Sequence, residues 1–181
     1  MRTVPRNTGQ MRHKRTVPLC FHAIPFYFDS ATFIEGVEAG DLFSLNTVLG
    51  STIEVQTVAV LNKLRNIWDP NGELSNYAFR RSSQSFPDVR LVNTLSPEVE
   101  PLLGIELKGW YVLTKEKAPT FRYRVTPNAC SEYDLLVVIP WHLNNVLAGK
   151  PVICEPFVVN EYGGSDLTLE PLRFDTCDGD I

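Results

Sequence analysis

The chain has 181 residues, of which 44% are hydrophobic and 21% are charged, a balance typical of one globular domain that buries its own core. A formal net charge of -4 at pH 7 excludes nucleic-acid binding through overall positive charge, so such binding would need a local basic patch or metal ions. The four cysteines form no CxxC pair, which argues against a zinc ribbon and against a disulfide framework.

The two ends of the chain differ in charge. Residues 1–18 carry arginine and lysine but no acid, whereas residues 161–181 carry acids against a single arginine. We therefore expect a basic N-terminal arm over 1–18 and an acidic C-terminal tail over 161–181, both poorly packed. No repeat or linker divides the chain, so one domain over 1–181 is predicted. Reduced cysteines, no typical signal peptide and no apolar run of roughly twenty residues favour a cytoplasmic protein with no membrane partner.

The first predicted element is a helix from about Thr52 to Trp68. Its apolar residues recur at helical spacing, and the "DPNG" that follows is a helix stop. Ser51 and Glu54 have the spacing of a capping box, which would place the helix start beside them. The upstream stretch "SATFIEGVEAGDLFSLNTVLG" is compatible with a helix or with two short turns because its glycines blur any boundary.

Strand patterns follow the helix. In "FPDVRLV" the apolar residues fall on one face and Asp88 on the other, and in "LLGIELKGWYVL" Glu106 and Lys108 lie opposite the apolar residues. "TFRYRV" also alternates, and "TPNACSEY" has the Thr-Pro start of a short helix. "DLLVVIPW" is a continuous apolar run of the kind found in a strand covered on both faces. This order predicts an α/β fold with a mixed sheet.

The charges inside these strand patterns predict a site. Residues two apart on a strand point to the same side, so Glu106 and Lys108 project together, and Asp88 joins them if its strand is the neighbour. Two carboxylates with a nearby backbone carbonyl offer the hard oxygen ligands that Mg²⁺ or Mn²⁺ prefers. A lysine beside them can orient and help deprotonate a bound water that attacks phosphorus. The alternative is a charge pair on a solvated sheet face, with Asp88 as a turn residue after Pro87.

The segments "PDV" and "GIELKGW" resemble the PD-(D/E)XK nuclease superfamily, to which many type II restriction endonucleases belong. Pro87-Asp88 matches the first half of the motif and Glu106-Leu107-Lys108 the second, and the elements over about residues 51–141 are similar to the superfamily's αβββαβ core. The resemblance implies a restriction-endonuclease-like core, a mixed β-sheet flanked by helices, with a divalent metal and DNA cleavage. It also implies a carboxylate from the first core helix; Glu54 matches, although the capping box explains it equally well.

These observations predict an Mg²⁺-dependent DNA endonuclease of the restriction-enzyme type, which cleaves double-stranded DNA with a metal-activated water. Asp88 and Glu106 would bind Mg²⁺, or Mn²⁺, with help from the Leu107 carbonyl; Lys108 would position the nucleophile, and Glu54 is a further catalytic candidate. On the "TFRYRV" strand, Arg122 and Arg124 project from one side and are candidate DNA-phosphate contacts. Their ordinary alternative is a solvated strand face.

Three other interpretations stay open. The same core serves repair, recombination and mobile-element nucleases. A DNA-binding module of this fold without chemistry belongs to another class, although the intact Asp88, Glu106 and Lys108 favour an active enzyme. An unrelated α/β domain with surface charge pairs is the third. The sequence leaves the choice between a monomer and a homodimer open.

Overall fold

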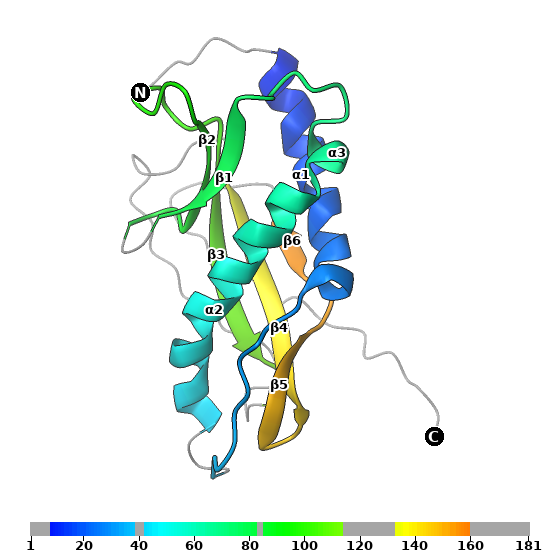
Figure 1. Cartoon of the computed structure of the whole chain (residues 1–181), viewed down its shortest axis with the longest axis vertical. Coiled ribbons are helices and arrows are strands. Elements are labelled where there is room, and N and C mark those ends of the chain that lie inside the picture. The colour runs from blue at the N-terminus through cyan, green and yellow to red at the C-terminus, as the bar shows by residue number, and fades with distance from the viewer. Residues whose placement is uncertain (1–7, 39–41, 83–84, 114–132, 160–181) are drawn as a thin grey trace.

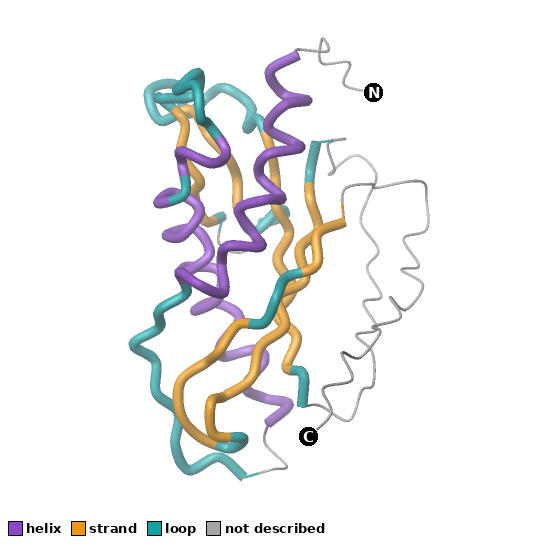
Figure 2. The backbone as a smooth tube through the Cα atoms, turned by 90° about the vertical axis from the view of Figure 1, so that its right-hand side faces the viewer, coloured by secondary structure: helices purple, strands orange, loops and turns teal. Residues whose placement is uncertain are grey.

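The computed structural model describes residues 8–38, 42–82, 85–113 and 133–159. The chain is an α/β protein with a six-stranded mixed sheet (Figure 1). Viewed from the side, the helices lie along one face of that sheet (Figure 2). The helices are α1 (Thr8–Tyr27), α2 (Leu42–Lys63) and α3 (Arg65–Trp68). The strands are β1 (Tyr77–Arg81), β2 (Val89–Asn93), β3 (Leu103–Tyr111), β4 (Leu135–Asn145), β5 (Ala148–Ile153) and β6 (Phe157–Val159).

The sheet order is β1-β2-β3-β4-β5, and β6 pairs with β4 as well. Strands β1, β2 and β3 form an antiparallel meander, whereas β3 and β4 are parallel. Strands β5 and β6 both run antiparallel to β4. A parallel pair needs a crossover connection of a dozen or more residues, and residues 112–134 supply that length between β3 and β4. Most of this connection lies outside the described residues.

The helix expected from Thr52 to Trp68 is present, but it begins at Leu42 and is divided at Leu64 into α2 and α3. Leu49 is fully buried, so the upstream segment extends the apolar stripe of the helix. The capping-box interpretation of Ser51 and Glu54 is therefore wrong. Both residues lie inside α2, where backbone N–H groups are already bonded within the helix and need no cap.

Helix α1 replaces most of the expected basic arm over residues 1–18. It begins at Thr8, and its buried residues recur at helical spacing; they are Val17, Cys20, Phe21 and Ile24. This stripe packs in the same core as α2 and the inner face of the sheet. The arm interpretation is thus wrong for residues 8–18, because the apolar stripe anchors the helix that contains them. Residues 1–7 and the expected tail at 161–181 lie outside the described residues.

The strand patterns are confirmed for β2, β3 and β4. Val89 and Leu91 of β2 are buried, and Ile105 of β3 lies in the same core. Every residue of β4 from 135 to 141 is buried, as expected for a strand covered on both faces. Strand β1 was not predicted. The patterns "TFRYRV" and, except for its last residue, "TPNACSEY" fall outside the described residues.

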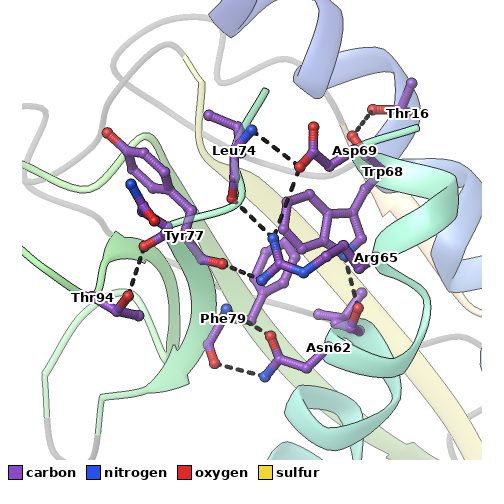
Figure 3. A network of polar contacts seen from close by, with 11 residues as sticks. Thr16, Asn62, Arg65, Trp68, Asp69, Leu74, Tyr77, Phe79 and Thr94 are labelled. Atoms are coloured by element: carbon purple, nitrogen blue, oxygen red, sulfur yellow. Dashed lines mark hydrogen bonds and ion pairs between the residues drawn. The ribbon is translucent and has the colours of Figure 1, made fainter. Parts of the chain in front are cut away.

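A polar network fastens α2 and α3 to β1, the edge strand (Figure 3). The Asn62 amide accepts from the Phe79 N–H at 3.0 Å and donates to the Phe79 carbonyl at 2.9 Å. Arg65 donates to the carbonyls of Leu74, at 2.9 Å, and Tyr77. These side chains occupy backbone groups that an edge strand would otherwise offer to another chain. None of the described helices is long and apolar enough to cross a membrane.

Candidate functional site

The register between β2 and β3 brings the predicted residues together. Val89 lies opposite Ile105, so the register extended by one residue sets Asp88 opposite Glu106. Asp88 lies in the bend that immediately precedes β2, and its carbonyl accepts the Ser82 N–H at 2.7 Å. Residue 108 follows two positions after 106 on the same face, and the Lys108 Nζ lies 2.5 Å from the Glu106 Oε1. Asp88, Glu106 and Lys108 therefore converge at the end of the β2–β3 pair.

A backbone contact fixes the Asp88 carboxylate. Its Oδ2 accepts the Leu107 N–H at 2.9 Å. Pro87, which would oppose Leu107 in the extended register, has no N–H to donate to the Leu107 carbonyl. The N–H and C=O of one strand residue point to the same edge, so the Leu107 carbonyl faces the edge on which Asp88 lies. Two carboxylates and one backbone oxygen are thus grouped at this point.

The electrostatics of the group act on Asp88. Burial raises the pKa of Asp88 from 3.8 to about 6. The Leu107 N–H opposes this rise, the Glu106 charge adds to it, Lys108 lowers the pKa and Glu54 raises it. Burial and neighbouring carboxylates both disfavour the ionised form. A divalent cation beside Asp88 would reverse that balance, since its charge favours ionised ligands.

Glu106 and Lys108 do not form a pair on a solvated sheet face. Glu106 is only 4% exposed, and the Lys108 side chain is 30% exposed. Their register neighbours on β4 are Leu136 and Val138, and both are buried. The pair is therefore shielded from water on the β4 side, where its charges interact more strongly than they would in water.

Glu54 lies beside this group without a hydrogen bond or ion pair to its members. Its Oε2 accepts from the Arg81 Nε at 2.6 Å, across the α2–β1 contact. Its charge contributes to the raised pKa of Asp88, which shows that it is near. The structure thus brings Asp88, Glu106 and Lys108 together, and it places Glu54 at their border in an ion pair with Arg81.

The segment before Asp88 is held by contacts that the sequence analysis missed. Gly104 donates its N–H to the Asp134 Oδ1 at 2.8 Å. A Cβ at Gly104 would lie 2.4 Å from the Pro87 Cγ and 2.5 Å from that oxygen, so only glycine permits this approach. Arg90 donates to the Phe86 carbonyl at 2.6 Å. A glycine inside a strand pattern was the one signal of this close contact.

The residues present fit a hard divalent cation. Asp88, Glu106 and the Leu107 carbonyl offer only oxygen ligands, which suits Mg²⁺ or Mn²⁺. Across the described ranges, no three His, Cys, Asp and Glu side chains are gathered as a metal-binding group. The candidate metal site would therefore consist of two carboxylates and one backbone oxygen. The predicted phosphate contacts Arg122 and Arg124 lie outside the described residues.

No model of a known protein family matches the chain, and no curated protein matches its sequence. The function of the site must therefore be inferred from the chemistry of the residues that it groups.

Proposed function

We propose that the chain is an Mg²⁺-dependent endodeoxyribonuclease with a restriction-endonuclease-like core, which hydrolyses phosphodiester bonds in double-stranded DNA. The convergence of Asp88, Glu106 and Lys108 at the end of the β2–β3 pair is the observation that carries this proposal. The order of α2, β1, β2, β3 and β4 also supports it, because it accords with the αβββαβ core that the motif implies. The second helix of that core would fall within the crossover connection between β3 and β4.

The metal would be held by the Asp88 and Glu106 carboxylates together with the Leu107 carbonyl. When bound, Mg²⁺ supplies Lewis-acid chemistry, which polarises a phosphoryl oxygen and lowers the pKa of a water molecule. The Leu107 N–H keeps one Asp88 oxygen in place at 2.9 Å, so the other oxygen is free to turn toward a ligand. The raised pKa of Asp88 fits such a role, since perturbed carboxyl groups cluster at functional sites.

Lys108 would orient the attacking water and stabilise the charge that develops on the phosphate. Its ammonium is held 2.5 Å from the Glu106 Oε1, so it is fixed beside a proposed metal ligand. The side chain is partly exposed and can reach a substrate that approaches from solvent. Positive groups aimed in advance at developing charge are among the larger contributions to catalysis. Repair, recombination and mobile-element nucleases would use the same residues in the same way.

A plasmid cleavage assay tests this function. Supercoiled plasmid is incubated with wild-type protein in Mg²⁺, in Mn²⁺ and in EDTA, beside Asp88→Asn and Lys108→Ala. We expect metal-dependent nicking or linearisation by the wild type, and a loss of about 100-fold or more in each variant. Lys150→Gln is the matched control, because Lys150 is an exposed cation on β5.

Two results would contradict the proposal. Cleavage at equal rates by the wild type and the Asp88→Asn and Lys108→Ala variants would show that these residues do no chemistry. A wild-type protein that is folded by circular dichroism, yet cleaves neither plasmid nor linear duplex in either metal, would exclude a nuclease active on such DNA.

A further inference from the structure

Two arginines lie opposite each other beside the candidate site. Arg80 of β1 pairs in register with Arg90 of β2, and Arg90 pairs with Gly104 of β3. Because side chains two apart share a face, these arginines lie on the same face as Asp88 and Glu106. Two residues along a strand span about 7 Å, so the arginine row runs directly beside the carboxylate row.

Among the residues that the structure describes, no carboxylate pairs with these two cations. Like charges directly opposite on neighbouring strands destabilise a sheet. Over the described ranges, Arg80 is exposed and forms no ion pair or hydrogen bond, and Arg90 donates only to the Phe86 carbonyl and the Ser85 Oγ. The adjacent Arg81 points to the other face and binds Glu54 at 2.6 Å. Within the described part of the chain, Arg81, which faces α2, thus has a carboxylate partner, and Arg80 and Arg90 on the opposite face have none.

Hydroxyl groups lie at the same place. The Ser82 and Ser85 hydroxyls are 2.7 Å apart, and the Ser85 Oγ lies 3.4 Å from the Arg90 Nη2. Hydroxyl and guanidinium groups together are the usual donors to phosphate oxygens. An anion between Arg80 and Arg90 would also remove the repulsion between them.

We propose that Arg80 and Arg90, with the Ser85 hydroxyl, bind a backbone phosphate of DNA next to the phosphodiester that reacts at Asp88 and Glu106. Guanidinium groups match phosphate oxygens bidentately, which favours a phosphate over a simple halide. Among the described residues around the site, three cations, Lys108 with the two arginines, lie beside Asp88 and Glu106, although the whole chain has a net charge of -4. The identity of the anion as DNA rests on the proposed function, whereas the anion site itself rests on the arginine pair.

Binding measured without metal separates this site from catalysis. A fluorescein-labelled duplex is titrated with protein in EDTA over a series of NaCl concentrations, and binding is followed by fluorescence anisotropy. Each phosphate contact adds about 0.9 to the slope of log K against log salt concentration. We expect Arg80→Gln to weaken binding several-fold at low salt and to reduce the slope by about 0.9. Arg80→Lys should restore the slope without the full affinity, because lysine keeps the charge but loses the guanidinium fork.

Lys150→Gln is the charge-matched control and should leave the slope unchanged. The proposal is overturned if Arg80→Gln and Lys150→Gln have equal slopes, or if the wild type does not bind the duplex. It is also overturned if inorganic phosphate raises the melting temperature of the wild type but not of Arg80→Gln, while the two proteins bind the duplex with equal affinity. An Arg80-dependent duplex affinity in a protein that never cleaves DNA would refute the nuclease and retain the phosphate site. If cleavage depends on Asp88 but Arg80→Gln binds the duplex as tightly as the wild type, the nuclease is retained and the phosphate site is refuted.

Discussion

Replacement of Asp88 by asparagine is expected to stabilise the folded chain at neutral pH while it removes the proposed activity. Burial, reinforced by the Glu106 charge, raises the pKa of Asp88 from 3.8 to about 6. The folded state therefore holds an ionised carboxylate near pH 7 at a cost in free energy. Asparagine keeps the size of the side chain, and its amide oxygen can still accept the Leu107 N–H. The substitution thus removes the charge and retains the hydrogen bond.

The magnitude follows from the size of the pKa change. A rise from 3.8 to about 6 corresponds to about 3 kcal/mol, at about 1.36 kcal/mol for each pKa unit. Asp88 is only partly buried, and solvent screening reduces the expected gain of Asp88→Asn to about 1–2 kcal/mol near pH 7.5.

The direction of the pKa change determines how the stability of the wild type depends on pH. The folded state binds the Asp88 proton more tightly than the unfolded state does. Protonation of Asp88 therefore stabilises the wild type fully below pH 3.8, and this contribution is lost as the pH rises through about 6. The advantage of the variant should therefore shrink to about a third near pH 4.5.

Urea unfolding followed by tryptophan fluorescence measures this difference. Wild type and Asp88→Asn are compared in EDTA at about pH 7.5 and about pH 4.5, with Asp29→Asn as a control that neutralises an exposed acid and should change stability by less than about 0.5 kcal/mol. Added Mg²⁺ should raise the midpoint of the wild type and leave Asp88→Asn unchanged, because only a ligand of the folded state stabilises it. A variant that is less stable at both pH values, or a difference that does not depend on pH, would refute the electrostatic reasoning.

Three further substitutions test packing and hydrogen bonding in the fold. Gly104→Ala should lower the free energy of unfolding by about 1–3 kcal/mol, because its Cβ would lie 2.4 Å from a ring carbon of Pro87. The control Gly50→Ala, which has open space around it in α2, should raise the free energy of unfolding by about 0.5–1 kcal/mol. Urea unfolding that ranks the two variants the other way would contradict the close approach at Gly104. Asn62→Ala should cost about 2 kcal/mol in the same assay because both Phe79 backbone groups lose their partner, and a cost near zero would show that water replaces the amide. Thr57→Val should raise the free energy of unfolding by about 1 kcal/mol and with it the melting temperature, because the buried hydroxyl has no hydrogen-bond partner among the described residues; a lower melting temperature would imply a partner.

Strands β3 and β4 were predicted from patterns that lie within single segments. Strand β3 alternates apolar residues with Glu106 and Lys108, and β4 begins with a short continuous apolar run that is buried on both faces. The contact between Glu106 and Lys108 follows directly from the two-residue period of the strand. These are local properties, and one segment of sequence contains them in full.

The features that were missed depend on contacts between distant segments. Helix α1 contains Pro18 and Pro25, which argue against a helix locally, and packing of its apolar stripe in the core overrides them. Strand β1 ends in two arginines with no alternation, and its strand character comes from pairing with β2 and from the Asn62 contacts. The opposition of Asp88 and Glu106 depends on register, which no single segment specifies.

The adjacent residues Arg80 and Arg81 of β1 have different surroundings on the two faces of the sheet. They are adjacent in the sequence, so they must point to opposite faces of the sheet. Arg81 binds the Glu54 Oε2 and thereby fastens α2 to β1. Arg80 faces the side that holds Asp88, where a fixed positive charge without a carboxylate has no role in the packing of the described residues. Among the described residues, the arginine on the helix-covered face is therefore paired with a carboxylate, and the arginine on the opposite face is the one that we propose binds a phosphate.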